Sequence, residues 1–322
     1  MKTQSQLPES KHFRLEQLAQ GVWAAIHRQG GTAICNAGIV DLGGRTLVFD
    51  TFMAPQPGED LRVAAETLTG RPVNLVVNSH YDNDHIWGNQ AFDSPIFSTE
   101  TTRRLIVATK GCEDYDAALA NAPARLEAAK AAYAAAQTEP ERIQAALWVD
   151  DYQAVVDAAP ILHVRAPDVT FGGRMAFHGS ARSAELLELA GHTPSDAVLL
   201  LPEDGIAFMG DLLFVECHPY LGGGDPGALL SSLDAVSARG SWLPVPGHGP
   251  VGTPESLAQM QAYVLTLDGL ARGLVEAGEA QSKIDSLPVP PPFDGWLIDK
   301  FFSVNLHFLY QRHLPALGGS GA

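Results

Sequence analysis

The chain has 322 residues, with 21 Lys or Arg and 37 Asp or Glu, so its formal net charge is −16. Its hydrophobic content of 46% is typical of a packed globular protein and too high for a disordered one. The acidic balance argues against nucleic acid or an anionic membrane surface as the main partner. Three cysteines are too few and too scattered for a disulfide framework or a Cys-based zinc site: Cys35, Cys112 and Cys217.

No targeting or membrane segment is visible in the sequence. Residues 1–17 lack the apolar stretch of a signal peptide. No run reaches about 18 apolar residues without a charge, so the sequence predicts no transmembrane helix. We therefore expect a single cytoplasmic domain over residues 1–322 that acts on a small molecule and binds neither nucleic acid nor a membrane.

The first third of the chain is predicted to form strands joined by tight turns. Residues 13–26 and 33–51 carry apolar runs broken by glycines, as in β-hairpins. Residues 58–70 have helical spacing and end in glycine. Residues 73–78 form a short continuous apolar run, which is typical of a buried strand, and a dense polar cluster follows them directly.

The segment from about 100 to 160 differs in character from the rest. Residues 118–137 and 139–159 are rich in alanine and carry apolar residues at helical spacing. We predict a helical hairpin inserted into a β-rich frame. The hairpin is either plain structural support or a lid over a site. In the second case Leu147 and Trp148 are expected on its inner face.

Strand patterns return in the second half and alternate with helical ones. The strand-like segments are residues 168–179, 184–191, 196–211 and 241–249. The helical ones are residues 225–240, 253–278 and, after a Pro-rich connector, an aromatic tail at 295–313 within a C-terminal extension of about 280–322. This order predicts sheets covered by helices. The aromatic tail is compatible with a pocket wall, with ordinary core or with a homodimer face.

Three polar clusters each follow an apolar strand. They are the run HYDNDH at residues 80–85, the GHTP sequence at 191–194 with a Gly-Asp pair at 210–211, and the PGHG sequence at 246–249. Strand ends that lead into loops are where enzymes place reactive groups on a rigid frame. Imidazoles and carboxylates without thiolates are suited to zinc, iron or manganese.

This set of motifs resembles the metallo-β-lactamase superfamily, whose first motif is usually HxHxDH. Here Asp82 replaces the second histidine of that motif. The resemblance covers about residues 15–265 and implies an α/β fold, the αββα sandwich, with two packed sheets and helices on both outer faces. The helical insert and the C-terminal extension lie outside the common core.

The resemblance also implies a binuclear metal site, with two ions per chain and zinc favoured over iron or manganese. The implied ligands are His80, Asp82 and His192 for one ion, Asp84, His85 and His248 for the other, and Asp211 as a bridge. Asp84 and Asp211 are also the implied catalytic carboxylates. Asp50 matches a family position that orients a ligand histidine, although a turn role suits it equally well.

The implied activity is that of a metal-dependent hydrolase, in which a metal-bound hydroxide attacks an ester, lactone, thioester or related substrate. No Lys or Arg lies between Asp211 and Arg239. Many zinc β-lactamases use a lysine in this stretch, so its absence argues against β-lactams and favours a neutral to apolar substrate. The predicted substrate-binding residues are His218, Tyr220 and Trp87.

Asp82 leaves two further interpretations open. A third carboxylate makes the site less electrophilic and favours harder metals such as iron or manganese. The flavodiiron proteins of the same superfamily have a carboxylate at the matching position, so a di-iron oxidoreductase is the alternative to a hydrolase. A non-catalytic metal-binding protein is the third interpretation.

Overall fold

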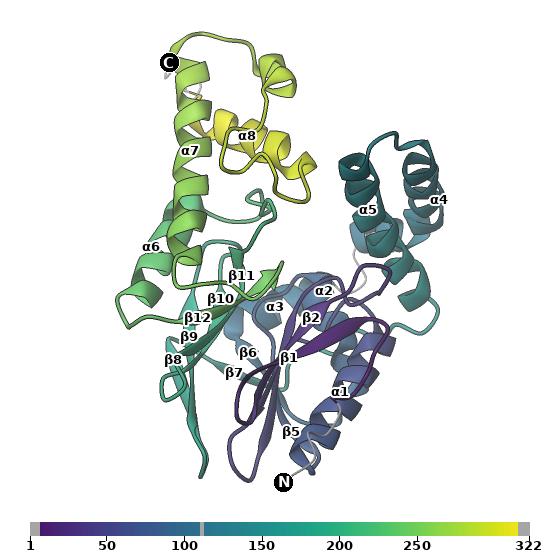
Figure 1. Ribbon diagram of the computed structural model, residues 1–322, viewed down its shortest axis with the longest axis vertical. Helices are drawn as coiled ribbons and strands as arrows, with labels where there is room; N and C mark the ends of the chain where they lie inside the picture. The colour runs from purple at the N-terminus through teal and green to yellow at the C-terminus, as the bar shows by residue number, and fades with distance from the viewer. Residues whose placement is uncertain (1–6, 110–112, 315–322) are drawn as a thin grey trace, which may run out of the picture.

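The computed structural model describes residues 7–109 and 113–314 and contains two β-sheets packed face to face, with helices on their outer sides (Figure 1). This is the predicted αββα arrangement. Cys112 and the last residues of the predicted C-terminal extension lie outside the described ranges. Both sheets are mostly buried because their strands carry apolar side chains on two faces.

The first sheet has seven strands whose spatial order is their order along the chain. The strands are β1 (Phe13–Ala19), β2 (Val22–His27), β3 (Ala37–Asp41), β4 (Thr46–Phe49), β5 (Val73–Val77), β6 (Ile96–Thr99) and β7 (Val169–Phe171). Pairing is antiparallel from β1 to β4 and parallel from β4 to β7. Helix α1 (Pro55–Thr69) connects the parallel strands β4 and β5 and ends at Gly70, which adopts a left-handed φ of 69°.

The second sheet has the spatial order β12-β11-β10-β9-β8. Its strands are β8 (Arg174–His178), β9 (Ser183–Leu189), β10 (Asp196–Leu201), β11 (Ile206–Phe214) and β12 (Leu243–His248). All pairs are antiparallel except β11 with β12, which needs a crossover, and helix α6 (Pro226–Ser237) provides it. Helix α7 (Ser256–Glu276) packs beside α6.

The layer between the sheets is apolar and is built by both of them. Val22 and Phe49 from the first sheet meet Leu199 and Phe208 from the second, and the rings of Phe49 and Phe208 lie 5.9 Å apart. At about 25 cal/mol per Å² of buried apolar surface, this layer is the main force that fixes the relative position of the sheets. Side chains placed at their common edge are therefore held on a rigid frame.

The predicted insert of about 100–160 divides into two parts in the structure. Helix α3 (Glu100–Thr109) packs on β6 and β7 and so belongs to the outer layer of the first sheet. Helices α4 (Glu113–Ala135) and α5 (Glu139–Ala158) form the hairpin. A capping box starts α5, because Thr138 and Glu141 exchange side-chain to backbone hydrogen bonds.

The hairpin and the C-terminal helices project from the same end of the sandwich (Figure 1). The short helix η2 (Gln281–Ser286) leads to α8 (Lys300–His313), which packs against α7. The Asn305 side chain fixes α8 to the loop after β11, because its amide donates to the Pro219 carbonyl (2.7 Å) and accepts from the Leu221 N–H (2.9 Å). Among the described helices, none combines the length and the apolar character that crossing a bilayer requires.

Candidate metal centre

The three polar motifs converge at one edge of the sandwich, where strands of both sheets end. The first sheet contributes the segment after β5, which runs through His80 into the short helix α2 (Asn83–Ile86). The second sheet contributes His192 after β9, Asp211 within β11 and His248 as the last residue of β12. All seven predicted ligands lie at this edge.

The first cluster consists of His80, Asp82 and His192, whose possible ligand atoms lie within 4.8 Å of one another. The Asp82 Oδ2 atom is 3.1 Å from His192 Nε2 and 3.5 Å from His80 Nε2. The carboxylate therefore reaches the two imidazoles although it is shorter than the histidine of the usual motif. Asp82 precedes the first residue of α2, and its extended backbone carries the side chain toward the cluster.

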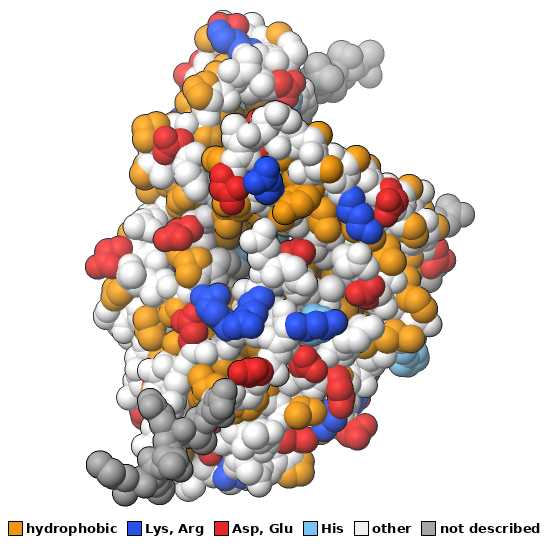
Figure 2. All heavy atoms as spheres, turned by 45° about the vertical axis from the view of Figure 1, so that its right-hand side comes forward, with side chains coloured by type: hydrophobic (Ala, Val, Ile, Leu, Met, Phe, Trp, Pro, Cys, Tyr) orange, Lys and Arg blue, Asp and Glu red, His pale blue; other side chains and the backbone are white. Residues whose placement is uncertain are grey.

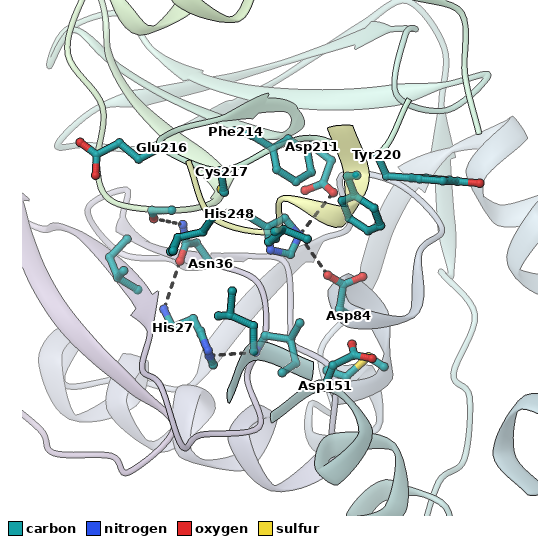
Figure 3. Close-up of a pocket in the computed structure, with 18 of the residues that line it drawn as sticks. His27, Asn36, Asp84, Asp151, Asp211, Phe214, Glu216, Cys217, Tyr220 and His248 are labelled. Carbon is teal, nitrogen blue, oxygen red and sulfur yellow. Dashed lines mark hydrogen bonds and ion pairs between the residues drawn. The ribbon is translucent and has the colours of Figure 1, made fainter. Parts of the chain in front are cut away.

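The second cluster is formed by Asp84, His85 and His248. The Asp84 Oδ2 atom lies 3.1 Å from His248 Nε2 and 3.6 Å from His85 Nε2. Asp84 and His85 are consecutive residues of α2, whereas His248 comes from the opposite sheet (Figure 3). The His248 ring stacks on Phe214 with a centroid distance of 4.9 Å, which fixes its plane.

Asp211 lies between the two clusters. Its Oδ2 atom is 3.4 Å from Nε2 of both His192 and His248, and its Oδ1 atom is 3.0 Å from His85 Nε2. Its side chain is 5% exposed. A carboxylate that faces imidazoles on both sides is suited to bridging two cations.

The chemistry of these groups fits metal ions. The Nε2 atoms of His80 and His85 and the Oδ1 atom of Asp211 are buried. Within residues 7–109 and 113–314 none of them has a partner in hydrogen-bond geometry, although His85 Nε2 and Asp211 Oδ1 lie 3.0 Å apart. Buried polar atoms of this kind are costly unless something binds them. Imidazole nitrogens and carboxylate oxygens clustered within 4.8 Å of one another are suited to zinc, iron and manganese.

The far side of the His80 and His85 rings is held by hydrogen bonds. Asp50 Oδ2 lies 2.8 Å from His85 Nδ1, and the same carboxylate accepts from the Ser79 N–H (2.7 Å) and hydroxyl (2.8 Å). The Ser79 Oγ atom lies 2.9 Å from His80 Nδ1. A partner at Nδ1 leaves Nε2 free to face a metal and fixes the ring orientation. The geometry thus gives Asp50 the orienting position, with a left-handed φ of 60°.

His192 is positioned by its own loop. The Asp196 carboxylate accepts from the His192 N–H (3.2 Å) and from the Thr193 hydroxyl (2.7 Å), which closes the loop on itself. The Tyr220 carbonyl oxygen lies 3.2 Å from His192 Nδ1. These contacts turn the imidazole Nε2 toward Asp82 and Asp211.

Gly247 and Asn36 set the position of the loop that carries His248. A Cβ atom on Gly247 would lie 1.8 Å from Asp211 Oδ1, so only glycine fits there. The Asn36 amide donates to the carbonyls of Pro246 (3.0 Å) and Gly249 (2.8 Å). Asn36 follows the loop between β2 and β3, so it ties the first sheet to the end of β12.

Close packing of opposite charges shifts the pKa values of the metal-free site. Burial by itself would raise the pKa of Asp211, yet the imidazoles around it, His248 foremost, hold it well below the usual value. Burial by itself would lower the pKa of the imidazoles, but the carboxylates raise it to about 9 for His192 and about 10 for His248. Protons and metal ions therefore compete for the same Nε2 atoms.

A cavity of about 560 Å³ opens from this centre toward the projecting helices. Its inner end contains Asp84, Asp211 and His248, which point at one another in Figure 3. The walls farther out are mostly apolar and come from three regions. They include Ile26 and Ile34 near the first sheet, Leu147 and Trp148 on α5, and Ile298 and Phe301 at the start of α8.

Only one of the three predicted substrate-binding residues lies in this cavity. Tyr220 lines it and packs its ring 5.5 Å from Phe301. His218 is fully buried elsewhere, with Nδ1 2.9 Å from the Tyr263 hydroxyl, and burial lowers its pKa to about 4. Trp87 starts the short helix η1 (Trp87–Ala91) and lies in a hydrophobic cluster beside Ile86. Both side chains are buried among apolar residues and do not line this cavity.

Three other residues that the sequence did not single out lie at the cavity or its inner end. His27 accepts the Ile34 N–H at Nδ1 (3.1 Å), and burial lowers its pKa to about 4, so the ring is neutral and bears its proton on Nε2. Asp151 lines the cavity from α5. Cys35 lies within 4.8 Å of the ligand atoms of Asp84 and His85.

Cys35 acts on the site through the backbone. Burial raises the pKa of its thiol to about 12, so the thiol stays protonated and donates to the Asp84 carbonyl oxygen, with Sγ 2.8 Å away. No sequence pattern predicted this contact, because Cys35 lies far from α2 along the chain. His27, by contrast, ends an apolar strand as its one ionisable group, and that break could have identified it.

Comparisons with known proteins agree with the fold. The metallo-beta-lactamase from Pontibacter korlensis superposes with a TM-score of 0.56 and 19% identity, over 79% of this chain and 99% of that one. The metallo-beta-lactamase from Hirschia baltica gives a TM-score of 0.54 and 15% identity, over 79% and 98%. A comparison with curated proteins gave no match.

A larger structure covers more of the chain. The stereoselective inverting sec-alkylsulfatase from a Pseudomonas species superposes with a TM-score of 0.66 and 18% identity. The match covers 96% of this chain and 51% of the alkylsulfatase, so the chain spans about half the length of that enzyme. At this level of identity the likeness concerns the fold.

The fold and the site together define a class of protein: an αββα sandwich with histidine and aspartate groups that could hold metal ions at the edge where the sheets meet. The family model of the metallo-beta-lactamase superfamily matches residues 30–251, which include all seven predicted ligands. The chain belongs to the metallo-beta-lactamase superfamily.

Proposed function

We propose that the protein is a metal-dependent hydrolase that holds two divalent cations and cleaves a small, neutral and largely apolar substrate. The observation that carries this proposal is the arrangement of two ligand clusters around a shared Asp211, at the inner end of an apolar cavity of about 560 Å³. A cavity of this size and character is typical of a small-molecule site.

In this proposal one set of residues binds the metal ions and another contacts the substrate. His80, Asp82 and His192 would hold one cation, and Asp84, His85 and His248 the other, with Asp211 between them. When bound, such cations supply Lewis acidity and lower the pKa of water. His27 lines the cavity, and with Nδ1 occupied by the Ile34 N–H its Nε2–H would be a donor for a polar atom of the substrate.

Zinc is the metal that this ligand set favours in our proposal. Four neutral imidazoles are combined with three carboxylates, and imidazole is a common ligand of zinc. Three carboxylates also suit iron and manganese. A protein that holds iron here would be expected to catalyse a redox reaction. The metal content of protein purified without added metal therefore separates a hydrolase from a di-iron oxidoreductase.

The walls of the cavity support a neutral and apolar substrate. Among the described residues that line it, Arg14 is the only Lys or Arg, and its guanidinium pairs with Glu16 at 2.6 Å. On the outer face in Figure 2, acidic and basic side chains are interspersed and hydrophobic ones are exposed between them. An anionic substrate such as an alkyl sulfate would lack a free cationic side chain for recognition, whereas an apolar ester, lactone or thioester would fill the cavity.

The proposal is tested by elemental analysis together with a substrate panel. The panel contains esters, lactones and thioesters with apolar chains, a β-lactam and a secondary alkyl sulfate. We expect close to two zinc ions per chain and hydrolysis of the apolar carbonyl substrates, which stops after treatment with a chelator and returns with zinc. Two irons with no hydrolysis would overturn the proposal, and cleavage of the alkyl sulfate alone would overturn the substrate class.

A further inference from the structure

Helix α5 presents one row of side chains to the cavity. Ile143, Leu147 and Asp151 are four residues apart and all line it, as expected for one face of a helix. The row is apolar except at Asp151. In Figure 3 the Asp151 carboxylate points toward the side of the cavity where Asp84 and His248 lie. The helix thus places a single carboxyl group opposite the metal centre.

Asp151 has no structural partner. Within the described residues its carboxylate makes no hydrogen bond or ion pair, whereas the adjacent Asp150 accepts the Gly30 N–H at 2.7 Å and lies outside the cavity. Aspartate is a poor helix former, and a half-buried carboxylate without a partner adds nothing to the stability of the fold. Neither helix formation nor packing accounts for an acidic residue at this position. A role in contacting a bound ligand accounts for it.

The surroundings of Asp151 favour its protonated form. Burial is the main cause that raises its pKa, to about 7, and the charge of Asp84 adds to the rise. The other charged groups that face it are His248, Arg125 on α4 and Asp150 on its own helix. A carboxyl group that carries a proton near neutral pH can give that proton to a substrate.

We propose, building on the hydrolase function above, that Asp151 is the acid that protonates the leaving group. In ester cleavage the bond between the carbonyl carbon and the leaving oxygen breaks, and its electron pair goes to that oxygen. The Asp151 Oδ–H proton forms the new O–H bond of the alcohol. Water supplies the OH group of the acid product, and the proton released from that water restores Asp151 through solvent.

The experiment uses a series of esters with one apolar acyl group and leaving alcohols that range from nitrophenol to a simple alkanol. A general acid matters most when the leaving group is a poor one, because a nitrophenolate departs without a proton. For D151N we expect a loss of about 10²–10⁴-fold in kcat/KM with the alkyl ester. With the nitrophenyl ester we expect a change below about threefold.

The matched control is D150N, which removes the neighbouring carboxylate on the same helix. It should lower thermal stability through the lost bond to Gly30 and leave the leaving-group dependence unchanged. Zinc content is measured for every variant and is expected to equal that of the wild type. D151S serves as a second variant, with the same expected pattern, where D151N is poorly folded.

Three outcomes would overturn the inference. Equal losses across the ester series would show that Asp151 only shapes the cavity. Loss of zinc in D151N and D151S would assign it to the metal centre. A wild type that binds two zinc ions but cleaves no member of the series would refute the proposed function itself, which distinguishes that failure from an error about Asp151.

Discussion

The two ends of the cavity are built in different ways. At the inner end the ligands come from the strands, from the loops that follow them and from the short helix α2. Neighbouring side chains such as Asp50, Ser79 and Asp196 hold some of these ligands by hydrogen bonds. At the outer end the walls come from α5, from the start of α8 with the segment before it, and from residues near the first sheet. Helix α5 meets the α8 region through the rings of Trp148 and Phe301, at a centroid distance of 5.9 Å, and through hydrogen bonds of the Gln144 side chain.

We therefore expect the inner end to determine metal binding and catalysis and the outer end to determine substrate specificity. The inner end tolerates little change, because its histidines and Asp211 are mostly buried and hydrogen bonds fix several of their orientations. The outer end is partly exposed, and few polar bonds fix it, among them the bond from the Ile298 N–H to Gln144 Oε1 at 2.8 Å. We expect substitutions at the inner end to remove metal and those at the outer end to change the choice of substrate.

The largest effect is expected for H85A and D211N. Each variant removes a group that faces both an ion and the opposite ligand cluster, so activity should fall by about 10³-fold or more and at least one ion should be lost. Elemental analysis and kcat/KM measure both effects. The exposed His178 provides the control, since H178A should change neither. Near-normal turnover by H85A would mean that the centre has been assigned wrongly.

A smaller and more selective effect is expected at Asp82. D82N should weaken the first cluster alone, because the second keeps Asp84, His85 and His248. Zinc titration of the apo protein should then change from a two-site to a one-site isotherm. D82H restores the usual ligand of the superfamily and should keep both ions. Identical two-site isotherms for wild type and D82N would remove Asp82 from the ligand set.

Metal removal should make stability depend on pH in a predictable direction. The raised pKa values of His192 and His248 stabilise the metal-free fold fully below pH 6.5, and this contribution is lost as the pH rises through about 9 and about 10. The Tm of the chelated protein should fall between pH 6.5 and 10, by about 2–4 °C for each kcal/mol lost. The zinc-loaded protein should change much less, because its imidazoles are already neutral. Parallel curves would contradict this.

The smallest effect on the metal centre is expected at the outer end. L147A and W148A enlarge the cavity without touching a ligand, so metal content should stay the same. The preference among acyl chains should shift toward longer or bulkier ones by about 10-fold, which corresponds to the 1–3 kcal/mol that small changes in an apolar pocket supply. Ratios of kcat/KM across a chain-length series measure the shift. Equal damage to zinc content would make α5 structural support.

The sequence predicted the inner end of the cavity better than the outer end. The ligand motifs are short and follow strands, so local order along the chain already brings Asp82, Asp84 and His85 together. Asp151 could not be predicted in this way, because its place depends on how a hairpin docks on a distant loop. His218 and Trp87 lie outside this cavity because proximity to a ligand in sequence does not determine which way a side chain turns, and both turn into apolar surroundings.

The division of the ligands between the sheets has a consequence for the lifetime of the folded chain. His80 and His85 follow a strand of the first sheet, whereas His192 and His248 belong to the second. A cation held by both would be a removable crosslink, since separating the sheets requires that it leave first. Metal supply would then set the unfolding rate as well as the activity, and a cell short of metal would lose the protein itself to proteolysis.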